Sequence, residues 1–398
     1  MVLLFSACAT HPRSHVALES LPASERGRAA KNLRVFDAVW DLVNRKHYEP
    51  QTHGVDWEAA AAKYAPLAAV APDERTLYRT INDMLEVLHD SHTHALTPAE
   101  AIERRTHERA RTGFSLTRVG EEWVVADVLP KSPAARAGVM PGWVVLTHDG
   151  TRLGDHPDFH PKEGQAVAWE FLDQHNLHVK VTLKAKVLST AGLQVDRVLD
   201  HGVVYLRFDE FDTVDRRWLG DQLRAHARAP AVIIDLRRNP GGDTGSLGIS
   251  IGEFFDHRVD CGTFVTRSGA RTMKRSFELG SAHYRGRVVV LVDRNSASSA
   301  EIFAAVLKDQ GRATIVGRKT AGAVLASWFF RLPGGGELQL SEADYIAPNG
   351  RRIESNGVEP DVVVTRSIAD LRAGRDPDLT AALKLLEAPA AEPASVAH

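Results

Sequence analysis

The chain has 398 residues, of which 43% are apolar and 25% are charged, proportions that exclude a disordered chain, a collagen-like chain and a coiled coil. Its 49 Lys and Arg residues nearly balance 51 Asp and Glu residues, for a net charge of -2, so the composition gives no electrostatic footprint for nucleic acid. No stretch of the sequence approaches the roughly 18 to 20 uncharged apolar residues of a membrane-spanning helix, and the two cysteines cannot form a disulfide framework or a cysteine zinc site. We therefore expect a soluble, multidomain globular protein.

The first residues resemble the end of a bacterial lipoprotein signal. An apolar run from Met1 to Phe5 leads into Ser6-Ala7-Cys8, and small residues before a cysteine are typical of signals in which that cysteine is lipidated. The usual basic segment is absent and the apolar run is short, so a loose tail is the alternative. We expect residues 1–27 to form a signal-like tail, with a lipid anchor at Cys8 and a periplasmic location in the bacterial cell envelope. Cys261 would then be a lone thiol, buried rather than reactive.

Residues 28–110 are expected to form a helical region. Apolar side chains recur there at 3.6-residue spacing in two runs, which are Leu33, Phe36, Val39 and Val43, then Leu77, Ile81, Met84, Leu85 and Leu88. We interpret Trp40, Asp56 and Trp57 as core or helix-capping residues. We interpret Arg104, Arg105 and Arg109 as a solvated helix face.

The helical region contains Asp90-Ser91-His92-Thr93 near its end. His92 is a candidate general base, because the pKa of an imidazole lies near neutrality. A zinc site made by His89, His92 and His94 is the alternative, but no Glu or His falls at the helical spacing of an HExxH motif. We therefore expect no metal at this segment.

Residues 111–188 are expected to form a small β domain. Short apolar runs at 123–125 and 144–146 flank an Ala-rich segment ended by Gly138, which is typical of a short helix. The arrangement resembles a PDZ domain, whose carboxylate-binding loop would be Thr112-Gly113-Phe114-Ser115. Such a domain adds a peptide as a strand and captures its C-terminal carboxylate with backbone amides. Gly113, Phe114 and Ser115 are thus candidate peptide-binding residues, and a β domain without a groove is the alternative.

Residues 189–386 alternate between strand-like and helix-like patterns. The runs 232–236 and 288–292 are almost continuously apolar, as expected for strands buried on both faces of a sheet. Helical patterns follow them, so this part predicts an α/β core. The fold class is therefore α/β, in an α+β multidomain arrangement, and the Ala- and Pro-rich tail at 387–398 is expected to be disordered.

The strongest candidate site follows the second of these strands, in the segment from Asn295 to Ile302. A serine at a strand-to-helix turn, here Ser298, has an exposed hydroxyl. The helix N-terminus beside it offers unbonded N–H groups and a positive dipole end, which makes the amide of Ser299 a candidate oxyanion donor. The alternative is that Ser296 or Ser298 only caps the helix.

Two further stretches carry candidate functional residues. Residues 235–242 run from a buried strand into a Pro-Gly-Gly turn, whose backbone a substrate can approach closely. Gly241 and Gly242 therefore join Ser299 as candidates for an oxyanion hole, and Arg237 or Arg238 could capture a substrate carboxylate. Residues 353–361, which include Glu354, read by themselves as a loop before a final strand.

Together these stretches resemble the C-terminal processing (tail-specific) peptidase family over nearly the whole chain. The resemblance implies a protease core of crotonase-like type in which Ser298 is the nucleophile. Lysine-dependent members carry their general base after a Gly-x-x-Thr-x-Gly segment, but here the matching segment 317–322 is followed by Ala323. Lys319, four residues earlier, is interpreted as a surface residue rather than a substitute.

The chain instead resembles the branch that includes the tricorn core protease, which uses a Ser-His-Ser-Glu tetrad. The matching residues here are Ser91, His92, Ser298 and Glu354. The resemblance implies that Ser298 attacks the scissile carbonyl, that His92 moves the proton, and that Glu354 acts through Ser91. No metal or cofactor is needed for this chemistry.

The function expected from this resemblance is a serine endopeptidase that cleaves polypeptides. It would engage C-termini or unfolded segments through the PDZ-like domain, and nucleic acid is not expected as a partner. Two alternatives remain open. One is a catalytically silent peptide- or ligand-binding protein on the same scaffold, and the other is an esterase or amidase acting on small molecules.

Overall fold

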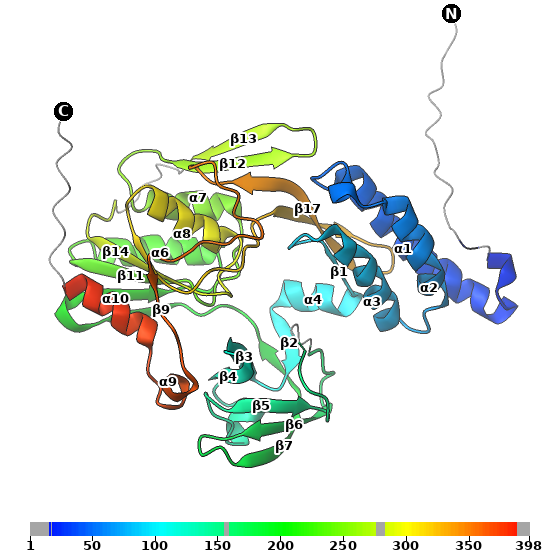
Figure 1. Ribbon diagram of the computed structural model, residues 1–398, viewed down its shortest axis with the longest axis horizontal. Coiled ribbons are helices and arrows are strands. Elements are labelled where there is room, and N and C mark those ends of the chain that lie inside the picture. The colour runs from blue at the N-terminus through cyan, green and yellow to red at the C-terminus, as the bar shows by residue number, and fades with distance from the viewer. Residues whose placement is uncertain (1–15, 17, 155–158, 276–282, 388–398) are drawn as a thin grey trace, which may run out of the picture. The chain divides into compact units, whose positions relative to one another are not determined.

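The computed structural model in Figure 1 describes residues 16, 18–154, 159–275 and 283–387. The expected lipoprotein-like features around Cys8, most of the expected 1–27 tail and the tail from residue 388 lie outside the described residues. Within those ranges, no helix is long and apolar enough to cross a membrane. The chain forms two compact units, the first made of Met1–Arg105, Asp260–Arg275 and Gly322–Asn356, and the second of Thr106–Val259, Ser276–Ala321 and Gly357–His398.

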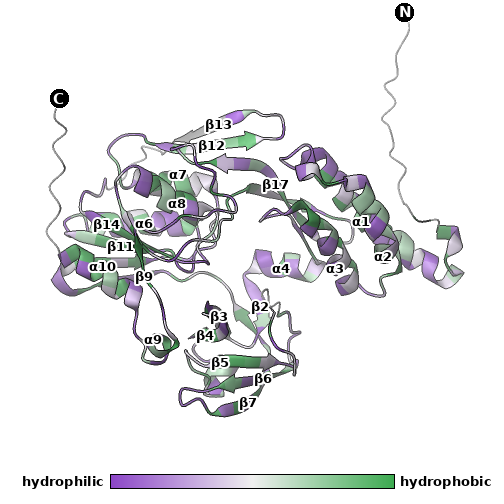
Figure 2. Cartoon of the chain, in the orientation of Figure 1, coloured by the Kyte–Doolittle hydropathy of each residue, from purple (hydrophilic) through white to green (hydrophobic). Residues whose placement is uncertain are grey.

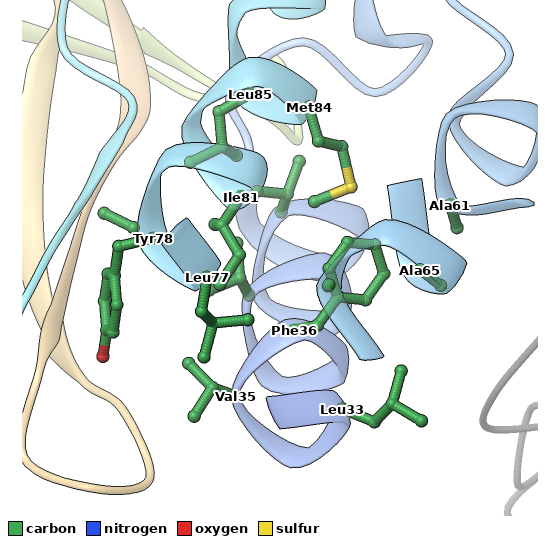
Figure 3. Packing of buried hydrophobic residues seen from close by; sticks show 14 of the residues in the cluster. Leu33, Val35, Phe36, Ala61, Ala65, Leu77, Tyr78, Ile81, Met84 and Leu85 are labelled. Carbon is green, nitrogen blue, oxygen red and sulfur yellow. The ribbon is translucent and has the colours of Figure 1, made fainter. Parts of the chain in front are cut away.

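The first unit begins with a helical layer. The helices are α1 (Ala23–Lys46), α2 (Trp57–Val70), α3 (Glu74–Leu85) and α4 (Pro98–Thr106). The apolar faces predicted from the 3.6-residue spacing meet between α1 and α3, where Phe36, Leu77 and Ile81 point toward one another (Figure 3). Asp56 caps α2 through the amide of Ala59, so its predicted capping role is confirmed.

A five-stranded antiparallel sheet completes this unit. Its centre is β17 (Glu337–Ile346), which pairs with β16 (Ala326–Arg331) and also with β1 (His94–Leu96) and β12 (Asp260–Thr266), while β13 (Arg271–Arg275) pairs with β12. Because β1 pairs with a strand about 240 residues later, the N-terminal segment shares one sheet with 260–275 and 322–356. This division differs from the continuous core expected over 189–386. Cys261 on β12 is buried, as expected.

The prediction that Arg104, Arg105 and Arg109 form a solvated helix face is only partly correct. Arg104 and Arg105 lie on α4, but they bond to the carboxylate of Glu337 at 2.8 and 2.6 Å. Glu337 is buried, and a buried carboxylate needs such counter-charges. Arg109 lies not on a helix but on strand β2 (Glu108–Arg111), which pairs with β8 (Lys186–Ser189).

The second unit contains a small antiparallel sheet. Its strands follow the order β3 (Phe114–Val119), β4 (Glu122–Val128), β5 (Val144–His148), β6 (Ala166–Leu172) and β7 (His178–Lys184). The short helix α5 (Pro133–Arg136) is capped by Ser132. Trp169 and Phe171 form the centre of this sheet's apolar core. Among the described strands only β4 pairs with β3, so β3 is an edge strand.

The second unit also contains a six-stranded sheet that positions the candidate site. The order is β18 (Val362–Val363), β15 (Thr314–Gly317), β14 (Arg287–Val292), β11 (Ala231–Asp235), β10 (Val204–Arg207) and β9 (Val195–Val198), and all neighbours are parallel except β9 with β10. Strands β11 and β14 are hydrophobic (Figure 2) and buried, as their apolar runs predicted.

Helices cover this sheet. Helix α10 (Pro377–Glu387) packs its leucines against residues of β10, β11 and β14. Helices α6 (Thr213–Ala225), α7 (Thr244–Gly252) and α8 (Ser299–Asp309) form a separate layer (Figure 1), and α9 (Ile368–Arg372) contacts the small antiparallel sheet through Leu371. The predicted mixed α/β multidomain class is confirmed. The turn between β14 and α8 carries Ser298.

Candidate active site

Ser298 stands at a strained strand-to-helix turn. Strand β14 ends at Val292 and α8 begins at Ser299, so Ser298 occupies the N-cap position. Its φ of 54° and ψ of -120° lie in a region that residues other than glycine rarely adopt, at a cost of about 1–3 kcal/mol. Ser298 and Glu301 also form a capping box at the start of α8. The predicted placement of Ser298 between a buried strand and a helix is therefore observed.

A buried glutamate holds this turn. The backbone N–H of Ser298 donates to Glu301 Oε2 at 3.1 Å, and the hydroxyl of Thr320 donates to Glu301 Oε1. Thr320 in turn accepts the amide of Val358 at 2.7 Å. Glu301 is fully buried, so these hydrogen bonds are not exchanged with water. The sequence reasoning missed Glu301, although a serine followed three residues later by a glutamate is the pattern of a capping box.

The Pro-Gly-Gly turn lies directly against Ser298. A Cβ added at Gly241, whose φ is 112°, would come within 2.6 Å of Ser298 Cβ. At Gly242 it would collide with the carbonyl of Phe211. Only glycine fits both positions. The hydroxyl of Ser299 donates to the carbonyl of Gly242 at 2.8 Å and ties the two loops together.

The backbone amides of this turn are not equivalent. The N–H of Gly241 donates to Asn239 Oδ1 at 2.9 Å, so it is not available to an oxyanion. Among the described residues, no acceptor takes the N–H of Gly242 or the N–H of Ser299. The structure therefore narrows the predicted donors to Gly242 and Ser299. The side chain of Asn239 accepts the N–H of Gly241, and the sequence analysis did not single out this residue.

The first unit brings together the other three predicted residues. Ser91 Oγ lies 2.7 Å from His92 Nδ1, and the Ser91 side chain is near enough to the carboxylate of Glu354 to lower the pKa of that carboxyl group. The backbone N–H of Val324 donates a hydrogen bond to Glu354 Oε2 at 2.8 Å. Glu354 is buried, His92 half-buried and Ser91 exposed. Ser91 thus contacts His92 and lies near Glu354, which accepts the amide of Val324.

Burial sets the protonation states in this chain. Burial lowers the pKa of His92 to about 4, against an opposing effect of Asp90. Burial raises the pKa of Glu354, while the hydrogen bonds from Val324 and Ser91 lower it. At neutral pH the imidazole of His92 is therefore uncharged, which is the form required of a general base.

The remaining candidates lie elsewhere or are already engaged. Lys319 is exposed and pairs with Glu359 at 3.0 Å, so its predicted surface position is confirmed. Arg237 is buried and bonds to Asp235, Asp376 and Asp378, and Arg238 bonds to Asp127. Three carboxylates occupy the buried Arg237, so this residue is not placed for the carboxylate capture suggested from the sequence. Arg238 pairs with the partly exposed Asp127, and its suggested role stays a prediction. In the ranges that the structure describes, no His, Cys, Asp and Glu side chains gather as a metal site.

A cavity of about 680 Å³ lies along β3 in the second unit. Its walls include Phe114 and Ser115 of the predicted peptide-binding loop, together with Trp123, Phe159 and Trp169. Gly113 lies behind this wall, where its carbonyl accepts the Ser132 hydroxyl at 3.1 Å and the amide of Leu129 at 2.8 Å. The cavity therefore combines aromatic side chains with the free edge of a sheet, which is the geometry of peptide addition.

Arg111 gives this cavity a positive charge. Its half-buried guanidinium lines the cavity, and among the described residues no carboxylate or carbonyl bonds to it. Burial and the neighbouring Arg109 and Arg238 lower its pKa. No Asp or Glu is among the described residues that line the cavity. An anion is therefore the ligand group that this wall favours.

A serine held in a strained strand-to-helix turn, beside two backbone amides without acceptors, is the nucleophile arrangement of a serine-type hydrolase. Comparison with known proteins agrees with that class. Residues 202–364 match the model of peptidase family S41, and residues 28–86 match the model of the tricorn protease C1 domain. The chain is a serine-type peptidase, and its residues 202–364 match family S41.

Similar proteins cover nearly the whole chain. A carboxyl-terminal-processing protease of Picosynechococcus sp. is 28% identical over 369 residues, which span 87% of each chain. The solved structure of a photosystem II D1 C-terminal processing protease has a TM-score of 0.62 at 23% identity and covers 91% of this chain and 98% of its own. The structure of mature CPAF complexed with lactacystin has a TM-score of 0.67 at 14% identity, over 90% and 98%. These two structures share the fold.

The lowered pKa of His92 is directly measurable. Its ring resonances can be assigned by comparing histidine NMR spectra of the wild type and His92→Gln, and then titrated. We expect a midpoint near 4, because burial disfavours the charged ring; the ordinary value is about 6.5. A midpoint at or above 6.5 would contradict the buried environment described for His92.

Proposed function

We propose that Ser298 is the nucleophile of this peptidase and His92 its general base, with Ser91 and Glu354 completing a tetrad. The observation that carries the proposal is the position of Ser91, whose Oγ lies 2.7 Å from His92 Nδ1 and whose side chain lowers the pKa of Glu354. The absence of a lysine at Ala323 and the exposed position of Lys319 support the same assignment, since no lysine base follows the segment 317–322.

The proposed tetrad selects one tautomer of His92. An ionised Glu354 only accepts, so in this tetrad the single proton of the Ser91 hydroxyl points to Glu354. Ser91 Oγ must then accept a hydrogen bond from His92 Nδ1. A neutral imidazole carries one N–H, so Nε2 keeps its lone pair and is the basic nitrogen. Glu354 thereby orients the base without touching the substrate.

The proposed reaction follows from these roles. His92 Nε2 takes the proton of Ser298 Oγ while the oxygen attacks the scissile carbonyl, and the amides of Gly242 and Ser299 stabilise the resulting oxyanion. His92 then gives the proton to the leaving amine, which departs and leaves an acyl-enzyme. A water molecule, deprotonated by His92 in the same way, releases the second product and restores Ser298.

We propose polypeptides with an accessible C-terminus as the substrates. The relatives named carboxyl-terminal-processing proteases support this class, and so does the cavity along β3, where an extended peptide could pair with the free strand edge. The cationic Arg111 suits the terminal carboxylate. The catalytically silent binding protein and the small-molecule esterase remain the competing assignments.

The nucleophile and base can be tested by labelling with a serine-directed fluorophosphonate. We expect the wild type and Lys319→Ala to be labelled, and Ser298→Ala and His92→Ala to remain unlabelled, because the probe reports an activated serine hydroxyl. Labelling of Ser298→Ala would contradict the assignment. Hydrolysis of a small ester without hydrolysis of a flexible polypeptide would favour the esterase.

Glu354→Gln should change the tautomer of His92 and lower kcat. The glutamine carbonyl would keep the amide of Val324, which leaves its NH₂ group facing Ser91. The Ser91 hydroxyl would then donate to His92 Nδ1, and the proton would move to Nε2. We expect kcat to fall by about 10³- to 10⁴-fold, as for the wrong tautomer in other triads. Glu359→Gln, an exposed carboxylate partner of Lys319, is the matched control and should retain full activity.

The role of Arg111 is testable by binding. Using full-length Ser298→Ala, which cannot consume the ligand, we expect Arg111→Gln to weaken a free-acid peptide about 10-fold, the value of one charge-assisted hydrogen bond. The same peptide with an amidated C-terminus should be unaffected by the substitution. Arg136→Gln, which changes an exposed arginine on α5, is the control. Equal weakening of both peptides would exclude carboxylate recognition by Arg111.

A further inference from the structure

Asp90, directly before the Ser91–His92 pair, collects five hydrogen bonds. Its Oδ1 accepts the amides of His92 at 3.0 Å and Thr93 at 2.7 Å, and the hydroxyl of Ser341 at 3.2 Å. Its Oδ2 accepts the hydroxyl of Thr93 at 2.7 Å and bonds to His47 Nε2 at 2.8 Å. None of the roles assigned to the tetrad uses this carboxylate.

His47 is the buried partner of Asp90. The side chains of His47 and Asp90 are 0% and 1% exposed. A carboxylate only accepts, so His47 Nε2 carries the proton of this bond, while Nδ1 faces the backbone of Glu49. Burial alone would raise the pKa of Asp90, but hydrogen bonds from His47 and Thr93 hold it at about 2. Asp90 is therefore an anion throughout the neutral range.

This pair joins three elements of the first unit that are distant in sequence. His47 ends helix α1, Asp90 opens the segment before β1, and Ser341 lies in the middle of β17. The amide of Tyr48 donates to the carbonyl of Ser341 at 2.9 Å, and the amide of Ser341 donates to Thr93 Oγ1 at 3.2 Å. The segment that carries Ser91 and His92 is thus attached to β17.

Strand β17 also leads to Glu354, another member of the proposed tetrad. Its last residue, Ile346, pairs with Arg352, which stands two residues before Glu354. One strand therefore holds Ser91 and His92 through Asp90 on one side and delivers Glu354 on the other. A displacement of the Asp90 segment would move Ser91 and His92 together relative to Glu354.

We infer that Asp90, secured by the buried His47, is a positioning residue that fixes the backbone of Ser91 and His92 relative to Glu354. The inference rests on the proposed function, since it assigns a consequence for His92 as a base. Asp90 contacts neither substrate nor reacting atoms in this role. It acts by holding the amide of His92, so its loss affects the turnover step rather than substrate binding.

The first test is Asp90→Asn, which keeps the volume and removes the charge and part of the accepting capacity. We expect kcat on a polypeptide substrate to fall about 10- to 100-fold with KM changed less than 2-fold, the range for a misplacement of about 1 Å. Asp73→Ala is the control, because Asp73 caps α3 through the amide of Thr76 in the same unit. It should lower the unfolding midpoint and leave kcat unchanged.

Two variants of His47 test the hydrogen bond between His47 and Asp90 if Asp90→Asn does not fold. A glutamine at position 47 can still donate to Asp90, whereas leucine cannot. We therefore expect His47→Gln to retain at least 10 times the kcat of His47→Leu. Equal kcat in the two His47 variants, or a kcat of Asp90→Asn within 2-fold of the wild type, would overturn the inference.

Hydrogen exchange separates this inference from the proposed function. In Asp90→Asn, exchange of the amides of His92 and Thr93 should speed up at least 10-fold, because both donate to Asp90. This readout does not depend on activity. Unchanged protection would contradict the positioning role even if labelling supports the tetrad. Lost protection in Asp90→Asn together with full labelling of His92→Ala would instead refute His92 as the base. The positioning of the His92 and Thr93 amides by Asp90 would still stand.

Discussion

The backbone conformation of Ser298 is the constraint on which the candidate site depends. A serine at φ 54° is unfavourable, and the turn persists because Glu301 accepts the Ser298 amide from a fully buried position. Thr320 and Val358 continue the same network into the following loops. The geometry of the hydroxyl is thus set by the packing of the second unit and does not require a bound substrate.

Each compact unit holds a preformed part of the machinery. The second unit holds the serine with the amides of Gly242 and Ser299, and the first holds Ser91, His92 and Glu354 in contact. In the second unit Glu301 holds the Ser298 amide, and in the first unit the amide of Val324 holds the carboxylate of Glu354. Buried hydrogen bonds of this kind make a site rigid. General-base catalysis needs this rigidity, because the atoms that donate and accept the proton must keep fixed positions.

Local patterns in the sequence predicted the local structure well. The apolar runs at 232–236 and 288–292 correspond to β11 and β14, and the segment after β14 does place Ser298 in a strand-to-helix turn. Contacts between distant residues were not predictable in this way. The occupied amide of Gly241 depends on the side-chain orientation of Asn239. Two of the three carboxylate partners of Arg237 lie about 140 residues further on.

The same limit applies to the first unit. The motif around His92 could be read locally, but its support by His47 and Ser341 arises only when α1, the 90–93 segment and β17 come together. The pairing of Arg104 and Arg105 with Glu337 also needs the sheet to form. Such non-local contacts follow from tertiary packing, which periodicity and spacing do not encode.

The order of the segments in the first unit has a consequence for biosynthesis. This unit is assembled from three separate stretches, and the last one, Gly322–Asn356, supplies both Glu354 and the central strand β17. A nascent chain that already contains Ser91, His92 and Ser298 still lacks the residues that orient the imidazole. Synthesis must therefore proceed past Glu354 before the proposed tetrad is complete, so a product truncated before this residue would lack the carboxylate that orients the base.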